Sequence, residues 1–285
     1  MKRFFARWGE GYLYRPSWFQ KILSFLLLPL SGLYCLAAYI RYRRSVPKQW
    51  GIPVVSVGNL TVGGSGKTPL VIELARHFEK PAVVLRGYGR KSRGMVVVKD
   101  RDILCDIETS GDEAMLYAMS LPHAVVIASE VRERGIAEAK AMGCDVVLLD
   151  DGYGKHTIEK LDLLIDVETP NHFCLPSGPY REWLWNGKTV IGVKEGKSFS
   201  RSVTLTAATP KMVLVTAIAR PDRLDPYLPE VAEKIYFEDH HFFTRGELEA
   251  IVERTGATSL LVTQKDFVKM ASFNLNLSVL ELSLS

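Results

Sequence analysis

A glycine-rich segment that ends in lysine and threonine has the residue types best suited to chemistry. It spans residues 58–68 (GNLTVGGSGKT) and follows the β-branched run 52–57 (IPVVSV). Lys67 would reach the β- and γ-phosphates of a nucleotide, and the Thr68 hydroxyl would bind Mg²⁺. The glycines that would let backbone N–H groups close around phosphate oxygens are Gly63, Gly64 and Gly66. The segment therefore predicts a site for a nucleoside triphosphate, with ATP as the expected ligand.

The glycine-rich segment departs in one place from the strict nucleotide-binding pattern. That pattern has glycine where this chain has Thr61. The turn must therefore be built differently at this position. The alternative is an ordinary glycine-rich turn between a strand and a helix, but strand, glycines, lysine and threonine all fall in register.

Acidic residues follow two further predicted strands or loops. Asp150 and Asp151 come directly after the apolar run 145–149, where a nucleotide-binding protein commonly keeps the carboxylate that holds Mg²⁺. Asp112 and Glu113 begin a predicted helix. The alternative interpretations are solvated turn residues for the first pair and first-turn acids favoured by the helix dipole for the second.

Transfer of a phosphoryl group to a hydroxyl needs a base and several cations. The basic loop 86–93 (RGYGRKSR) follows a strand and suits a second phosphate-bearing ligand, unless it is a flexible solvated loop. Arg181 and Glu182 follow a proline-rich turn. His240 and His241 follow Asp239 at a strand end, and one of them would orient or assist a carboxylate. A single histidine is more often structural.

Short apolar runs alternate with helical stretches and predict an α/β fold. Continuous apolar strands of this kind lie in a parallel sheet that helices cover. Helices are expected at about 69–79, 111–120 and 130–142. The first expected strands along the chain are 81–85, 95–98, 124–127, 145–149 and 161–165, and renewed strands of a second, smaller lobe follow at 212–215, 234–237 and 259–263. Ligands would bind in a cleft beyond the carboxyl ends of the strands.

The N-terminal segment predicts contact with a membrane. Residues 22–40 contain no charged side chain over nearly the length that spans a bilayer, although Pro29 and Gly32 interrupt the run. The first 50 residues hold nine Lys or Arg against Glu10 alone, within a chain of net charge +4. This charge lies beside aromatic residues and favours anionic lipid over nucleic acid. The alternative is an amphipathic helix buried on the protein's own core.

The composition sets broad limits. The chain has 285 residues, of which 47% are hydrophobic, and no repeat or low-complexity tract. Its four cysteines form no C-x-x-C pair, which favours reduced thiols over disulfides or zinc. We expect three parts: a membrane-associating segment at 1–50, a nucleotide-binding core at 51–155 and a second α/β lobe at 156–285.

Taken together, these motifs resemble the tetraacyldisaccharide 4′-kinase family of lipid A biosynthesis in Gram-negative bacteria. The resemblance extends from the basic N-terminal segment to about residue 269. The family's own glycine-rich loop also lacks the first glycine. The segments that carry the resemblance are 56–69 (SVGNLTVGGSGKTP), 86–90 (RGYGR), 111–113 (GDE), 149–152 (LDDG), 178–182 (GPYRE), 239–241 (DHH) and 263–266 (TQKD).

The resemblance implies a membrane-associated kinase on the cytoplasmic face of the inner membrane. It would use ATP and Mg²⁺ to phosphorylate the 4′-hydroxyl of an acylated glucosamine disaccharide 1-phosphate. Asp112 would be the catalytic base, assisted by His240 or His241, with Lys67 on the ATP phosphates. ATP would contact Thr61, Val62, Gly63, Gly64, Ser65, Gly66, Lys67 and Thr68; Mg²⁺ would contact Thr68, Asp150, Asp151 and Glu113; the lipid would contact Arg86, Tyr88, Arg90, Arg181 and Glu182.

One departure from the family and two rival functions stand beside this interpretation. The family usually continues Asp-Asp-Gly with Phe-Gln, where this chain has Tyr153 and Gly154. A membrane-tethered nucleotide switch is the first rival, but such proteins often carry a second lysine where this chain has Val62. A lipid-binding scaffold with a degenerate loop is the second rival, which the intact Lys67 and Thr68 disfavour.

Overall fold

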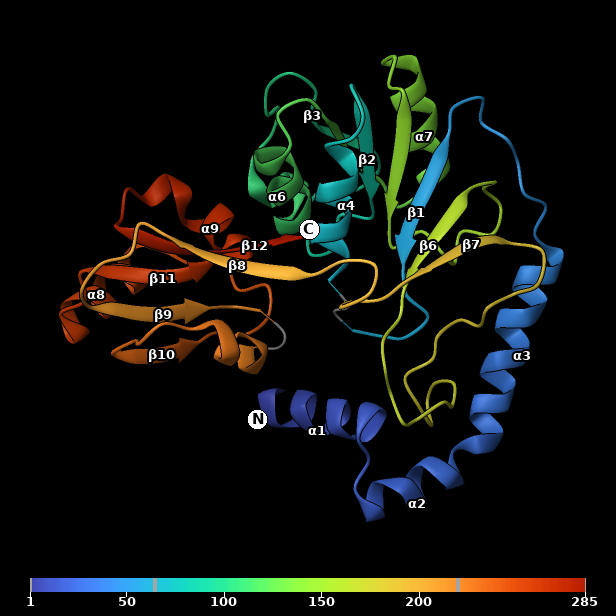
Figure 1. Cartoon of the computed structure of the whole chain (residues 1–285), viewed down its shortest axis with the longest axis horizontal. Coiled ribbons are helices and arrows are strands. Elements are labelled where there is room, and N and C mark those ends of the chain that lie inside the picture. Colours follow the sequence, from blue (N-terminus) through green and yellow to red (C-terminus); the bar gives the residue numbers. More distant parts are fainter. Residues whose placement is uncertain (1, 64–65, 219–220, 285) are drawn as a thin grey trace. The chain divides into compact units, whose positions relative to one another are not determined.

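The computed structural model describes residues 2–63, 66–218 and 221–284 (Figure 1). The chain divides into two compact units, each made from two stretches of sequence. Unit 1 comprises Met1–Lys67 and Leu148–Ser198, and unit 2 comprises Thr68–Val147 and Phe199–Ser285. The α/β fold class with a mostly parallel sheet and a smaller second sheet is confirmed.

Seven strands form the larger sheet among the described residues. Its strands pair in parallel except that β3 runs antiparallel to β4 at one edge, as far as the pairings are described. Every residue of β2, β4 and β5 is buried, which explains their uninterrupted apolar sequences. The strand order is β3 (Val96–Lys99), β4 (Val125–Ala128), β2 (Pro81–Leu85), β5 (Val146–Asp150), β1 (Val54–Gly58), β6 (Leu161–Ile165) and β7 (Thr189–Val193).

Helices of unit 2 pack on its strands. Gly135 shows how close that packing is, because a Cβ at this position would lie 2.6 Å from Cγ1 of Val84 on β2. Only glycine lets α7 approach the sheet this closely. The helices predicted at 69–79, 111–120 and 130–142 are confirmed with shifts of a few residues. They are α4 (Lys67–Ala75), α6 (Asp112–Ser120) and α7 (Arg132–Ala141), and the short helix α5 (Ile107–Ser110) precedes α6.

The smaller sheet lies within unit 2. Alternate residues of β9 face two apolar clusters: Val213 and Val215 pack with α8 and α9, and Leu214 packs with η1. The strand order is β10 (Glu233–Tyr236), β9 (Met212–Thr216), β11 (Ser259–Thr263), β12 (Leu277–Leu284) and β8 (Arg201–Thr206). The covering helices are α8 (Arg245–Thr255), α9 (Gln264–Met270) and the 3₁₀ segment η1 (Pro221–Tyr227).

Unit 1 begins with three helices, α1 (Lys2–Tyr14), α2 (Trp18–Leu26) and α3 (Leu28–Arg44) (Figure 1). Ser17 and Gln20 form a capping box that starts α2. In the part of the chain that the structure describes, no single helix is long and apolar enough to cross a bilayer. The pair α2 and α3 meets that test together, with a bend of 58° between them.

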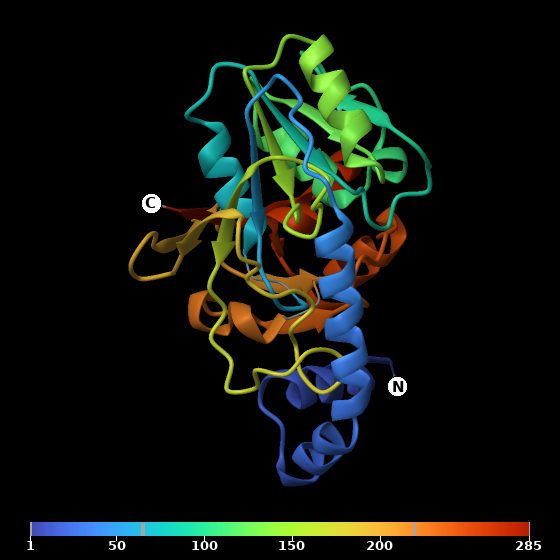
Figure 2. The same cartoon turned by 90° about the vertical axis from the view of Figure 1, so that its right-hand side faces the viewer.

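Helix α3 uses a polar stripe to pack on the segment 171–187, which runs beside it in both views (Figures 1 and 2). Ser31 donates to the Ser177 hydroxyl, Tyr34 to the Arg181 carbonyl and Arg41 to the Glu182 carboxylate. These positions recur at the helical period, so they share one face. The large apolar side chains of α3 away from this stripe are exposed: Leu30, Leu33, Leu36 and Ile40. The interpretation of α3 as a helix buried on the core is therefore wrong.

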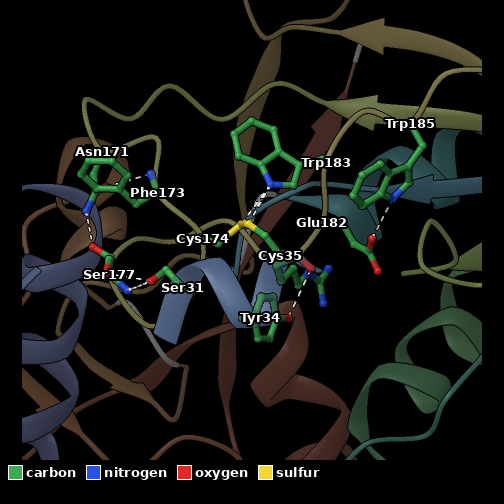
Figure 3. Close-up of a disulfide and its surroundings, with 11 residues drawn as sticks. Ser31, Tyr34, Cys35, Asn171, Phe173, Cys174, Ser177, Glu182, Trp183 and Trp185 are labelled. Carbon is green, nitrogen blue, oxygen red and sulfur yellow. Dashed lines mark hydrogen bonds between the residues drawn. A yellow bond between two sulfur atoms is a disulfide. The ribbon is translucent and has the colours of Figure 1, made fainter. Parts of the chain in front are cut away.

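A disulfide joins α3 to the same segment (Figure 3). Cys35 and Cys174 are 139 residues apart in sequence, but their Cα atoms lie 6.3 Å apart. The indole N–H of Trp183 lies 3.1 Å from Sγ of Cys35 and 2.9 Å from Sγ of Cys174. The expectation of four reduced thiols is wrong for this pair, because spacing in the sequence carries no sign of this contact. Cys105 and Cys144 are free thiols.

Candidate active site

The glycine-rich loop leaves β1 and enters α4. Gly63 and Gly66 have φ of 91° and 82°, a backbone region that glycine adopts without strain. Lys67 and Thr68 form the first turn of α4, where N–H groups and the helix dipole favour phosphate. Gly64 and Ser65, both predicted to contact ATP, lie outside the described residues.

Thr61 stands where the strict pattern has glycine, and the chain is extended there instead of forming a turn. It forms an antiparallel bridge with Tyr180, and the N–H of Val62 donates to the Pro179 carbonyl. The Thr61 side chain is buried and its hydroxyl accepts from the Asn59 amide. The loop is thus anchored on segment 179–182 before the glycines begin, so no glycine is required at position 61.

Lys67 belongs to a charged cluster in unit 1. Its Nζ lies 3.2 Å from Oδ1 of Asn59 and 3.6 Å from Oδ1 of Asp151. Arg181 donates to both carboxylate oxygens of Asp151, with Nη1 2.8 Å from Oδ2. Burial opposes the charge of Arg181, but the Asp151 carboxylate raises the pKa of Arg181. Two cations around one carboxylate leave a net positive charge, which suits the phosphates of a nucleotide.

The two acids at the end of β5, Asp150 and Asp151, differ in burial and in backbone conformation. Asp150 is buried at the end of the strand, whereas Asp151 has a φ of 54°, a left-handed conformation that few residues other than glycine adopt. Such backbone is typical of functional sites. The turn directs Asp151 to Arg181 and Lys67.

Glu182 does not share the role of its neighbour Arg181. Its carboxylate is buried and accepts from Arg41 of α3 at 2.5 Å and from the Trp185 indole at 3.1 Å. Burial would raise the pKa of Glu182, but His156 and Trp185 lower it. These contacts show a group that fastens α3, and they do not present Glu182 to a substrate.

A buried carboxylate and a histidine form a second cluster in unit 2. Asp112 is 3% exposed at the start of α6, and its Oδ2 accepts from Nδ1 of His240 at 2.8 Å. The other ring nitrogen of His240, Nε2, lies 3.8 Å from Oδ2 of Asp239. His240 has a φ of 60°, a left-handed conformation that its neighbours must hold in place.

Two lysines from α9 also approach Asp112. Nζ of Lys265 and Nζ of Lys269 lie 3.8 Å and 3.6 Å from Oδ2 of Asp112. Burial alone would raise the pKa of Asp112, but the hydrogen bond from His240 and the lysine charges lower it to about 2. The carboxylate is thus ionised at neutral pH. Both lysines were missed in the sequence analysis, although their spacing of four residues places them on one helix face.

His241 and Glu113 do not join Asp112 in the same way. The ring of His241 stacks on Phe237 with centroids 4.7 Å apart, and its Nε2 lies 3.4 Å from Oε1 of Glu247. Oε1 of Glu113 lies 3.5 Å from Nζ of Lys265. Of the two adjacent histidines, only His240 reaches Asp112.

The basic loop 86–93 lies beside the Asp112–His240 pair. The ring of Tyr88, which is 64% exposed, has its centroid 5.5 Å from that of His240. The loop and Glu130 line an open depression of about 340 Å³. Arg86 is exposed there. Arg90 instead donates to Glu130 and to the carbonyls of Ala128 and Gly94, so its guanidinium braces the loop.

The acidic residues of the described chain offer few oxygen donors for Mg²⁺ in one place. No group of three or more His, Cys, Asp or Glu that could hold a metal ion occurs within residues 2–63, 66–218 and 221–284. Mg²⁺ in nucleotide sites takes one or two protein oxygens and completes its shell with phosphate and water. The carboxylate oxygens of Asp150 and Asp151 fit that chemistry.

Comparison with known proteins places this chain among named relatives. A family model described as tetraacyldisaccharide-1-P 4′-kinase matches residues 23–198 and 189–285. A tetraacyldisaccharide 4′-kinase from Aliarcobacter butzleri is 43% identical over 295 residues, which cover 100% of this chain and 94% of that protein. The Helicobacter pylori protein of the same name is 44% identical and covers 96% of this chain and 89% of its own length.

A solved structure shows the same fold. The crystal structure of LpxK from Aquifex aeolicus in complex with ATP matches this chain with a TM-score of 0.72 at 27% identity. The match covers 92% of this chain and 95% of that one. The protein that binds ATP in that crystal is thus similar to this chain over nearly its whole length.

Proposed function

The chain belongs to the tetraacyldisaccharide 4′-kinase family, and from this premise we propose that it transfers the γ-phosphate of ATP to the 4′-hydroxyl of a tetraacyl glucosamine disaccharide 1-phosphate. The product is lipid IVA, a precursor of lipid A. The observation that carries the proposal is the hydrogen bond between Asp112 and His240. A carboxylate–histidine pair is suited to take the proton from an acceptor hydroxyl.

The glycine-rich loop and Lys67 hold ATP in this proposal. Backbone N–H groups near Gly63 and Gly66 bind phosphate oxygens, and Lys67 neutralises charge on the β- and γ-phosphates. Asp151 and Arg181 hold Lys67 and Asn59 in position. Asp150 or Asp151 would hold Mg²⁺, which would offset the negative charge on the phosphates.

The Asp112–His240 pair takes the proton of the acceptor. His240 is the more exposed partner, at 23% of its side chain against 3% for Asp112. Asp112 fixes the ring through Nδ1, so Nε2 can accept the proton and the carboxylate stabilises the imidazolium. The acceptor oxygen forms its bond to the γ-phosphorus while the bond from that phosphorus to the β,γ-bridging oxygen breaks, and ADP leaves.

The loop 86–93 supplies contacts to the acceptor. Arg86 and the exposed ring of Tyr88 are suited to a phosphorylated sugar, because a cation pairs with phosphate and an aromatic ring packs on the sugar face. Arg90 acts through the loop and does not contact the substrate, since Glu130 and two carbonyls occupy its donors.

Helices α2 and α3 attach the enzyme to the lipid surface. Side chains of Trp18, Phe19, Phe25, Leu26 and Leu33 are between 64% and 77% exposed. The surface of a soluble monomeric protein rarely exposes so many large apolar side chains together. The basic residues Arg43 and Arg44 follow at the end of α3 and attract anionic headgroups. The acylated substrate lies in the same membrane, whose cytoplasmic face is the one that offers ATP.

The test is transfer of ³²P from the γ-position of ATP to a detergent-dispersed acylated disaccharide 1-phosphate, with Mg²⁺. We expect a labelled lipid whose formation is lost in Lys67→Ala. Hydrolysis of ATP without labelled lipid would favour the nucleotide switch and reject the kinase. Labelled lipid at the same rate in Lys67→Ala would reject the proposed ATP site.

A further inference from the structure

Unit 1 contains a polar cavity at the opposite edge of its sheet from the glycine-rich loop. The cavity has a volume of about 260 Å³. Lys160 immediately precedes β6 and Lys188 immediately precedes β7, so both stand at the amino ends of these strands. The glycine-rich loop instead follows the carboxyl end of β1, which runs parallel to β6. The cavity is therefore separate from the ATP loop within this unit.

Two lysines share one buried carboxylate in the cavity wall. Nζ of Lys160 lies 3.4 Å from Oδ1 of Asp162, and Nζ of Lys188 lies 3.1 Å from Oδ2. The Lys160 and Asp162 side chains are each 1% exposed and Lys188 is 9% exposed. The Asp162 carboxylate also accepts from Ser56. Lys160 also donates to the Lys155 carbonyl and Lys188 to the Tyr153 carbonyl. These carbonyls carry no charge, so Lys160, Lys188 and Asp162 together hold one positive charge in excess, which is costly without a counter-ion.

A buried histidine adds an unused polar atom to the same wall. The His156 side chain is 2% exposed, and its Nε2 lies 3.5 Å from Oε2 of Glu182. Its Nδ1 has no hydrogen-bond partner within the described residues. Such an atom in a buried position calls for a partner that is missing from the chain itself.

We infer that this cavity is a second anion site, which takes a phosphate group through Lys160, Lys188 and His156. Phosphate supplies acceptor oxygens for both lysines and for the histidine, and its charge neutralises the excess. The cavity has ample room for a phosphate group. Burial and the neighbouring Lys188 lower the pKa of Lys160 to about 8, against the opposing effect of Asp162, as expected for a cation that lacks part of its counter-charge.

The cavity opens at the membrane-facing helix. Part of its rim is formed by Tyr42 and Arg43 in the last turn of α3 and by Ser45 directly after this helix. Glu159 is also at the rim, where its carboxylate accepts from the Gln49 amide. The exposed apolar side of α3 ends only two residues before the rim, at Ile40. A phospholipid headgroup and a free phosphate both have the required chemistry, and the inference does not depend on the transfer reaction.

The first experiment compares thermal unfolding of the full chain in inorganic phosphate and in chloride at equal ionic strength. Because the ATP loop would also take phosphate, every protein carries Lys67→Ala. The variant Lys160→Met keeps the aliphatic stem and leaves Asp162 paired with Lys188. The control is Lys197→Met, which changes an exposed lysine of the same unit.

We expect phosphate to raise the unfolding temperature of the parent and of the Lys197→Met control by a few degrees, and to lose this effect in Lys160→Met. Without phosphate, Lys160→Met should be at least as stable as the parent, because the excess charge is gone. A purely structural ion cluster predicts the reverse: lower stability without phosphate and an unchanged phosphate effect. That pair of results would overturn the inference.

The second experiment identifies the source of the phosphate group. Binding is measured to vesicles of phosphatidylcholine alone and to vesicles that also contain phosphatidylglycerol. The preference for phosphatidylglycerol is the ratio of binding to the two kinds of vesicle. If the ligand is a headgroup, Lys160→Met lowers this ratio at least threefold and Lys197→Met leaves it unchanged. A phosphate effect on unfolding with an unchanged lipid preference assigns the site to soluble phosphate. If neither depends on Lys160, the inference is wrong.

Discussion

The adjacent histidines His240 and His241 occupy different environments, and replacing them should have different effects. His240 holds the Asp112 carboxylate at 2.8 Å, whereas His241 stacks on Phe237. We expect His240→Ala to lower kcat by about 100- to 10,000-fold, the usual contribution of a general base. His241→Ala is the matched control and should keep kcat within roughly tenfold. Equal losses in the two variants would contradict the proposed base.

The low pKa of Asp112 predicts an effect on stability at acid pH. Its folded-state pKa of about 2 lies below the ordinary 3.8, so the contribution is present above pH ~4 and disappears as pH falls through 2. The shift corresponds to about 2 kcal/mol. Urea unfolding from pH 6 to 2 should show the wild-type advantage over Asp112→Asn shrinking across this window. An advantage that does not vary with pH would contradict the assignment.

The sequence identified the residue types of both clusters but not their partners. Asp112, Lys67 and Asp151 stand at strand or helix ends, where chemistry is expected in an α/β fold. It could not separate His240 from His241, because a left-handed φ at His240 decides which ring turns to Asp112. The sequence also could not predict the hydrogen bond from Arg41 to the Glu182 carboxylate, because these residues are 141 apart in the chain.

At the scale of elements, α3 reverses the usual arrangement of an amphipathic helix. Its polar stripe, which includes Ser31, Cys35 and Arg41, faces the protein, and its leucines are exposed. Deletion of residues 1–44 would therefore remove contacts of segment 171–187 as well as any membrane contact. Substitutions on the exposed side test the membrane role alone.

We predict that Leu33→Glu with Leu36→Glu weakens binding to vesicles on the order of 100-fold, because burial of each leucine contributes about 1.5–3 kcal/mol. The two side chains are 64% and 53% exposed, so the fold should not change. Ile191→Glu on β7, at 51% exposure, is the control and should bind normally. Co-sedimentation with vesicles measures the effect. Unchanged binding of the double variant would assign this apolar side to another partner.

Burial separates most of the strands that the sequence predicted from two of those that it missed, although the half-exposed β10 was predicted and β12, which buries Ser278–Leu280, was missed. The strands β2, β4, β5, β9 and β11 are buried throughout and were found within a residue or two of their ends. The edge strand β7 and strand β8 are half-exposed, with polar or small residues between apolar ones. Their sequences resemble loops, and pairing with neighbours holds them in the sheets.

At the scale of the whole chain, the Cys35–Cys174 bond closes a long covalent loop. It spans 139 residues and encloses the glycine-rich loop and both acids after β5. In the chain-entropy account, closing a loop of this length stabilises the fold by up to about 5 kcal/mol. Sequence could not reveal the pair, because no local pattern marks two cysteines that only the fold brings together.

We predict that reduction by dithiothreitol lowers the unfolding temperature of the wild-type protein and leaves that of Cys35→Ser unchanged. Cys35→Ser alone should match the reduced wild type, since both lack the same loop closure. Thiol titration of the denatured, unreduced protein should find two reactive groups, Cys105 and Cys144. Four reactive groups would show that α3 is held to segment 171–187 by its hydrogen bonds and packing alone. In that case the stripe formed by Ser31, Tyr34 and Arg41 would have to position α3 by itself.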